Sequence, residues 1–144
     1  MICARCFKAL FGAVLVALSG VSVAAGLTVE DGWVRAVPPV STTTAGYFTL
    51  TNEGDETVTL TGFTTDIAGA GELHTMAAQE DGTRRMQRLP DVPVPAGETV
   101  HFAPGGHHLM LFRLARPLEE GEEVELCLTF AEADDLCAPF DVRR

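Results

Sequence analysis

The segments Glu123-Val-Glu-Leu-Cys-Leu-Thr-Phe130 and Leu136-Cys-Ala-Pro-Phe-Asp-Val142 decide the fold class of this chain of 144 residues. Apolar residues occupy every second position in both, which is the period of a β-strand with one buried face. If Cys127 lies opposite Cys137, apolar residues also face each other along the pair. The predicted neighbours are Leu128 with Leu136, Leu126 with Ala138, and Val124 with Phe140. The segments therefore predict an antiparallel hairpin stapled on its outer face by a Cys127–Cys137 disulfide, and a metal site of free thiols is the alternative.

The preceding chain shows the same kind of pattern, with short β-rich runs between turn residues and no helical period of useful length. Further strands are predicted at residues 29–37, 46–52, 57–63, 73–79, 83–89, 99–103 and 107–115. We expect the runs 46–52 and 57–63 to pair as a hairpin, residues 64–71 to form a flexible loop, and residues 90–97 to form a proline-rich connection. A single all-β sandwich or barrel from residue 26 to residue 144 is the result.

The amino terminus has the features of a secretory signal. Arg5 and Lys8 precede an apolar run at residues 9–18, and small residues follow up to Ala25. The apolar run is short for a membrane span, which needs about 20 residues. We therefore predict a signal peptide over residues 1–25 that is cleaved on export. No cysteine directly follows the apolar run, so lipid attachment there is not supported. An oxidising compartment suits the predicted disulfide.

The charge of the chain restricts its partners. The whole sequence has 10 Lys and Arg against 20 Asp and Glu. Cleavage after residue 25 removes two basic residues and no acid, which leaves 8 against 20 and a formal charge of −12. Such a surface repels nucleic acid and anionic membranes. It suits an exported protein that meets cations or basic partners, and no membrane span is expected in the mature chain.

The four histidines and three of the four methionines lie between residues 72 and 110. Imidazole nitrogens and thioether sulfurs together favour a soft metal ion, and Cu(I) fits them best. His108 and Met110 are two residues apart, so on a strand they share a face, while Leu109 and Leu111 point to the core. His74 and Met76 follow the same rule on an earlier strand.

The turn after His74 decides whether Met86 can join this face. A two-residue turn at Asp81-Gly82 would send Met86 to the opposite side. A three-residue loop at residues 80–82, with Gly82 in the left-handed conformation, places Met86 opposite Met76 and diagonal to His74. We predict the second register, because it is the one compatible with a shared ion.

The remaining polar residues of this stretch have simpler interpretations. His101 and His107 are expected to be surface residues, and His107 points away from His108. Met76 is either a spare sulfur ligand or a flanking residue. We expect neither Glu72 nor Glu80 to share a face with His108 and Met110.

The chain resembles the PCu(A)C family of periplasmic copper chaperones. The histidine–methionine signature of that family matches His74, Met86, His108 and Met110 in residue type and spacing. Further similar motifs are Trp33-Val34-Arg35-Ala36, Pro38-Pro39, Ala45-Gly46-Tyr47, Thr51-Asn52, Pro104-Gly105-Gly106, Leu109-Met110-Leu111 and Arg116-Pro117-Leu118. The resemblance covers nearly the whole mature chain. Two features depart from the family: the chain ends without a His/Met-rich tail, and Cys127 and Cys137 are not part of the signature.

The resemblance implies a cupredoxin-like Greek-key barrel or sandwich that binds one Cu(I) through His74, Met86, His108 and Met110. It also implies a periplasmic chaperone that delivers copper to cytochrome c oxidase assembly, directly or through a partner copper chaperone. A copper-buffering or resistance protein would use the same ligands. An electron-transfer cupredoxin would need a cysteine thiolate, and a metal-free adhesion module would bind no copper. No nucleophile–base pair is evident, so we do not expect an enzyme.

Overall fold

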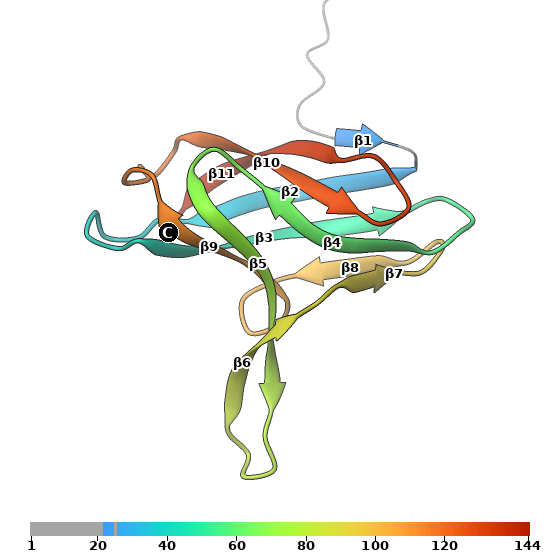
Figure 1. Ribbon diagram of the computed structural model, residues 1–144, viewed down its shortest axis with the longest axis horizontal. Helices are drawn as coiled ribbons and strands as arrows, with labels where there is room; N and C mark the ends of the chain where they lie inside the picture. Colours follow the sequence, from blue (N-terminus) through green and yellow to red (C-terminus); the bar gives the residue numbers. More distant parts are fainter. Residues whose placement is uncertain (1–21, 25) are drawn as a thin grey trace, which may run out of the picture.

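The structure is a computed structural model that describes residues 22–24 and 26–144, and all of its regular elements are β-strands (Figure 1). The strands are β1 (Ser22–Ala24), β2 (Leu27–Arg35), β3 (Thr43–Asn52), β4 (Val58–Thr64), β5 (Ala68–Ala78), β6 (Arg84–Leu89), β7 (Val92–Val94), β8 (Thr99–Phe102), β9 (His108–Leu114), β10 (Glu123–Phe130) and β11 (Leu136–Arg143). In these ranges no helix is long and apolar enough to cross a membrane.

β1 falls inside the segment predicted to be a signal peptide and pairs antiparallel with β2. The other residues of that segment, 1–21 and 25, lie outside the described part of the chain. The signal peptide and its boundary after residue 25 therefore stay predictions.

The strands form one sheet in the order β6-β5-β9-β3-β2-β11-β10-β4-β7, while β8 pairs with β3. Neighbouring strands are antiparallel except for β11 and β2, which are parallel. The hydrogen-bonded path begins at β6 and ends at β7, so the sheet is open. The prediction of an all-β domain is confirmed.

The sheet curls so that β11 lies across the core from β3 and β8 (Figure 1). Phe48 on β3 stacks on Phe102 of β8 with ring centroids 4.4 Å apart, and it meets Phe140 of β11 edge-on at 5.8 Å. These rings join the two layers through apolar burial and aromatic contact. The hairpin β5–β6 extends away from this body.

The carboxyl-terminal hairpin has the predicted register. Cys127 lies opposite Cys137, and each of the three predicted apolar pairs is a register pair between β10 and β11. The two sulfur atoms are bonded at 2.00 Å. The alternating apolar face is buried and Cys137 lies on the exposed face, so the cysteine pairing and the strand period together located this disulfide correctly.

The predicted hairpin between residues 46–52 and 57–63 is wrong. β3 pairs with β2, β8 and β9, whereas β4 pairs with β10 and β7. The reason lies in Asn52, whose buried side-chain amide donates to the carbonyls of Glu56 (2.7 Å) and Val94 (2.9 Å). Its side-chain oxygen accepts from the Gly54 N–H at 3.0 Å. The bond to Val94 ties the end of β3 to β7, the partner of β4, so it favours a crossing of the chain to the other layer over a return beside β3.

The predicted loop at residues 64–71 is strand from Ala68 onward. Ala68 pairs with Leu114 and Gly71 pairs with Leu111 of β9. The residues are small because the Phe63 ring covers this strand: a Cβ on Gly71 would lie 2.5 Å from the ring. Tertiary packing here overrides weak strand propensity.

The predicted connection at residues 90–97 contains the short strand β7. Pro93 lies opposite Thr59 of β4, and β7 ends the path of strands. An edge strand accepts a proline because its outward N–H has no ladder partner to lose.

Candidate metal centre

Three neighbouring strands, β6, β5 and β9, carry the predicted metal ligands. His74 of β5 lies directly opposite His108 of β9, and their ring centroids are 5.8 Å apart. On the other edge of β5, Met76 lies directly opposite Met86 of β6. The pairing therefore gathers residues from three strands on one face of the sheet.

The β5–β6 turn has the predicted three-residue loop. The Gln79 N–H donates to the Thr83 carbonyl at 2.8 Å, which leaves residues 80–82 as the loop. Gly82 has φ of 82°, the left-handed conformation that favours glycine. Asp81 accepts hydrogen bonds from the Thr83 hydroxyl and N–H, and these bonds lower the pKa of Asp81 below its ordinary value. The loop thus brings Met86 to the face that carries His74.

His108 presents one free ring nitrogen to this face. Its side chain is buried, with 6% of the residue exposed, and its Nδ1–H donates to the Gly106 carbonyl at 2.9 Å. That bond leaves a lone pair on Nε2, which faces Sδ of Met86 at 3.4 Å. A nitrogen lone pair and a thioether sulfur facing each other at this distance are two donors suited to one soft cation.

His74 has the opposite tautomer. Its Nε2–H donates to a carboxylate oxygen of Glu72 at 2.8 Å, so the lone pair is on Nδ1. This Nδ1 is buried and has no hydrogen-bond partner among the described residues. Buried polar atoms are normally satisfied, and a bound cation would satisfy this one.

Glu72 is the residue that the sequence reasoning missed. The hydrogen bond from His74 lowers the pKa of Glu72 below its ordinary value, against some opposing desolvation and with further help from the charge of Arg88. Nε of Arg88 lies 3.8 Å from the second carboxylate oxygen. Glu72 also lies directly opposite Met110 in the ladder, so our expectation that it shares no face with Met110 is wrong. The signal was present, because residues two apart on a strand share a face.

Met110 lies on the same face of β9 as His108, because residues two apart on a strand share a face. Leu109 and Leu111 are fully buried in the core, while Met110 is half-buried on the opposite face. Met86 is 47% exposed and forms the outer side of the centre. Met76, half-buried and opposite Met86, remains either a spare sulfur or a flank.

The other two histidines lie outside this group. His101 is exposed on β8, where Nδ1 lies 3.3 Å from the Thr49 hydroxyl. His107 lies beside Phe102 with ring centroids 5.6 Å apart. His107 is half-buried instead of lying at the surface, and its Nδ1, like that of His74, is buried without a hydrogen-bond partner among the described residues. The exclusion of His101 and His107 from the ligand set therefore stays a prediction.

The donor set favours one kind of ion. The four predicted ligands would offer two imidazole nitrogens and two thioether sulfurs, and Cu(I) accepts such ligands without a demanding geometry. Cys127 and Cys137 lie near Glu125, but their sulfur atoms are bonded to each other. They therefore provide no thiolate of the kind that a blue-copper site uses.

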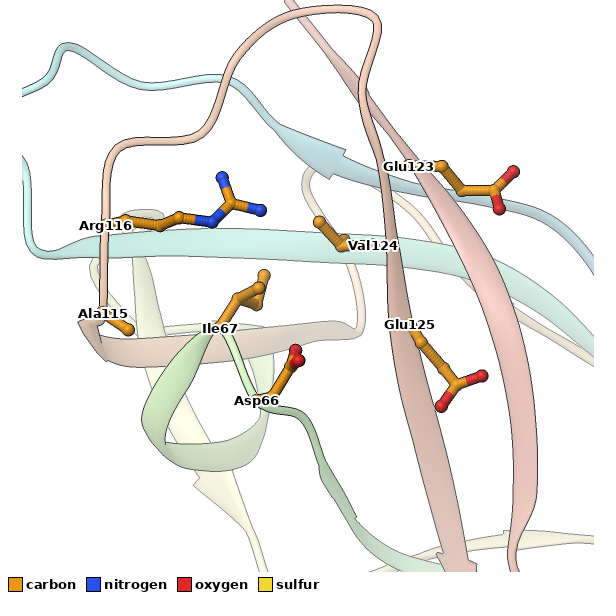
Figure 2. Close-up of a pocket in the computed structure, with 7 residues that line it drawn as sticks. All are labelled: Asp66, Ile67, Ala115, Arg116, Glu123, Val124 and Glu125. Atoms are coloured by element: carbon orange, nitrogen blue, oxygen red, sulfur yellow. The ribbon is translucent and has the colours of Figure 1, made fainter.

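A cavity of about 360 Å³ lies elsewhere, between the Asp66-Ile67 turn, the chain after β9 and strand β10 (Figure 2). Its polar lining consists of Asp66, Arg116, Glu123 and Glu125, and neither histidine nor methionine is present. The cavity therefore lies away from the histidines and methionines. A soft metal binds where its nitrogen and sulfur donors are, so this cavity is not the candidate metal site.

Together, the fold and this centre define a β-sandwich domain with a histidine–methionine cluster, and the comparisons with known proteins agree. The family described as "Putative lipoprotein LpqE-like" matches residues 27–142. A curated relative, the putative lipoprotein Lxx21020 of Leifsonia xyli subsp. xyli, is 33% identical over 107 residues. That match covers 74% of this chain, and the chain spans 63% of the length of the relative.

Solved structures show the same fold. The Cu(I)-bound DR1885 of Deinococcus radiodurans is 34% identical, with a TM-score of 0.65 over 80% of this chain and 76% of that one. The copper-bound PCuAC domain from PmoF2 is 21% identical, with a TM-score of 0.73 over 85% of this chain and 97% of that one. The expected cupredoxin-like fold is confirmed. The chain belongs to the LpqE-like family, which is the PCu(A)C family of copper-chaperone domains.

Proposed function

We propose that this chain is a periplasmic Cu(I) chaperone that binds one Cu(I) as its cargo and delivers it to cytochrome c oxidase assembly, directly or through a partner copper chaperone. The ligand atoms are Nδ1 of His74, Sδ of Met86, Nε2 of His108 and Sδ of Met110. The export of the chain rests on its amino-terminal sequence and agrees with the lipoprotein descriptions of the family and the relative.

The contact between Nε2 of His108 and Sδ of Met86, 3.4 Å long, carries this proposal. The Gly106 carbonyl holds the ring hydrogen on the other nitrogen, so both atoms present lone pairs to the same point. A cation between them turns this contact into two bonds. The orphaned Nδ1 of His74 gains a partner in the same step.

Neutral ligands also suit a carrier. Thioethers add no charge and hold Cu(I) without the strength of a thiolate. The exposed Met86 leaves one side of the ion open to an incoming ligand. Copper can then leave by exchange of one ligand at a time, which is what delivery requires.

The test is anaerobic titration of the protein with Cu(I) in the presence of a competing chelator. One equivalent should bind, X-ray absorption should show sulfur and nitrogen neighbours together, and Zn(II) should bind far more weakly. A double variant, His101→Ala with His107→Ala, is the control and should bind normally. Absence of stoichiometric Cu(I), or neighbours of nitrogen and oxygen alone, would contradict the proposal.

Delivery needs a second measurement. Loaded protein should metallate the copper centre of an apo-oxidase subunit, or a periplasmic chaperone that serves it. A deletion strain should lose oxidase activity and regain it with added copper. Normal oxidase activity at limiting copper, combined with increased copper sensitivity, would assign the chain to buffering instead.

A further inference from the structure

The strand that carries Met86 is basic, although the protein is acidic. Of the 10 Lys and Arg residues in the sequence, Arg84, Arg85 and Arg88 fall within β6, which is six residues long. All three are exposed. Arg84 and Arg88 share the strand face of Met86, and we call this pair the arginine face, while Arg85 lies on the opposite face.

The arginines outside this strand are mostly engaged with acids or with backbone. Arg116 pairs with Glu122 at 2.9 Å, and Arg144 pairs with Glu120 at 2.8 Å. Arg143 pairs with both Asp31 and Asp141, at 2.9 Å each. Arg113 donates to the Gly69 carbonyl at 2.7 Å. The charges of Arg116, Arg143 and Arg144 are therefore balanced on the protein itself, whereas Arg113 donates to a carbonyl that carries no charge.

The positive charges of β6 are compensated less well by acidic side chains. Arg88 has only a 3.8 Å contact with Glu72, whose other oxygen is occupied by His74, and the Arg88 side chain is 70% exposed. Arg84 donates to the Met76 carbonyl at 3.0 Å, which leaves its charge uncompensated. No ion pair involves Arg85 in the described part of the chain. The other acids of the hairpin, Glu80 and Asp81, lie in its loop, and Asp81 is occupied by Thr83.

The placement of these charges relates them to copper transfer. Arg84 and Arg88 lie two residues to either side of Met86, so they flank it on one face of the strand. Met86 is the exposed ligand of the proposed centre. A partner that takes copper from Met86 must therefore approach between the two guanidinium groups.

We propose that the arginine face is the docking surface for a copper-transfer partner with an acidic surface around its own copper ligands. This inference rests on the proposed function. The formal charge of −10 on the whole chain would repel such a partner elsewhere, so the arginine face selects both the partner and its orientation. Complementary charges of this kind raise association rates and fix the register of encounter.

The test uses two synthetic acceptor peptides with the same Cys-x-x-Cys copper-binding core, one flanked by glutamates and one by lysines. Transfer from the Cu(I)-loaded protein is followed by stopped flow, through the Cu(I)–thiolate absorbance that forms on the peptide. At low salt the glutamate peptide should receive copper about tenfold faster or more, and the difference should shrink as salt is added.

Three matched variants separate local charge from net charge. Substituting Arg84, Arg85 and Arg88 by glutamine should abolish the preference, whereas substituting them by lysine should preserve it. Substituting Arg116, Arg143 and Arg144 by glutamine removes the same total charge elsewhere and should also preserve it. Chelator competition on every variant reports Cu(I) affinity independently, so failure of copper binding is distinguished from failure of docking.

Equal rates for the two peptides in a protein that binds Cu(I) normally would overturn the docking surface and leave the proposed function intact. Loss of the preference in the Arg116, Arg143 and Arg144 variant would also overturn it, because net charge would then be the cause. Vesicles of phosphatidylcholine and phosphatidylglycerol in equal parts provide a further check. Binding to these vesicles through the arginine face, without a peptide preference, would assign the face to a membrane and overturn the proposal.

Discussion

Nε2 of His108 lies 3.4 Å from Sδ of Met86, although the two residues belong to strands that do not pair with each other. β5 runs between β9 and β6, so the methionine side chain reaches across a whole strand to meet the imidazole. Neighbouring strands are spaced about 4.8 Å apart, so β6 and β9 are about 9.6 Å apart, and the methionine and histidine side chains bridge this distance together. The centre is therefore shared between the body of the domain and its protruding hairpin.

Replacing Met86 or Met110 by leucine should weaken Cu(I) binding and leave the fold intact. Leucine has nearly the volume of methionine, and such exchanges cost less than about 1.5 kcal/mol of stability even in a core. Each change removes one sulfur ligand, so the loss of affinity should exceed the ~10–100-fold that loss of an outer partner costs. Chelator competition measures the affinity, and thermal unfolding monitors the fold.

Met76→Leu is the matched control for these two variants, since Met76 lies opposite Met86 on the neighbouring strand. Undiminished affinity in Met76→Leu would identify Met76 as a flank. Undiminished affinity in Met86→Leu or Met110→Leu would show that the ligand set is wrong.

Glu72→Leu should lower Cu(I) affinity by about 10–100-fold, the usual effect of losing the partner that orients a histidine ligand. Without the carboxylate, the His74 ring loses the bond that holds its hydrogen on Nε2 and its lone pair on Nδ1. Glu72→Gln retains an acceptor oxygen and should recover most of the affinity. Equal affinities of the two variants would mean that Glu72 does not act through this hydrogen bond.

Gly82→Val should reduce Cu(I) affinity although it removes no ligand. A Cβ at this position would meet nothing within 4 Å, so the effect comes from the backbone alone. The left-handed conformation costs a residue with a side chain about 1–2 kcal/mol, and a slipped hairpin would turn Met86 to the other face. Gly82→Asn tolerates that conformation and serves as control. Normal copper binding by Gly82→Val would show that the register of this hairpin does not depend on its loop.

Replacing Cys127 and Cys137 together by serine should destabilise the domain and spare the metal centre. Closing a loop of this size by a disulfide contributes about 2–4 kcal/mol, and urea unfolding should show a loss of that order. Two strands separate β11 from β9 in the sheet and three separate β10 from it, so Cu(I) affinity should not change. Loss of copper binding in a variant that remains folded would indicate a redox link between the disulfide and the centre.

Several elements were predictable because local chemistry determines them. Gly82 allows one kind of loop, and that loop determines which residue faces Met76. Cys127 and Cys137 agree with the apolar alternation of their strands, so two independent constraints gave one register. The histidine–methionine signature of the family and the strand alternation selected the same candidate ligands, on the face of the sheet that carries His74 and His108.

The errors arose where distant parts of the chain decide the structure. The crossing after β3 depends on a hydrogen bond from Asn52 to Val94, which is far along the sequence. The first residues of β5 are strand because Phe63 covers Gly71, although alanine and glycine favour strands weakly. The error at Glu72 has another cause. Residues two apart on a strand share a face, and we applied this rule to His108 and Met110 but not to Glu72 and His74.

β6 ends the path of hydrogen-bonded strands, so one of its edges has no strand beside it in the described part of the chain. Open edges of this kind invite another strand, and they are a common starting point for aggregation. If two copies met edge to edge at β6, the arginines of one would face those of the other at short range. Their repulsion would oppose such pairing, so the charges beside Met86 also protect this open edge against another copy of the chain.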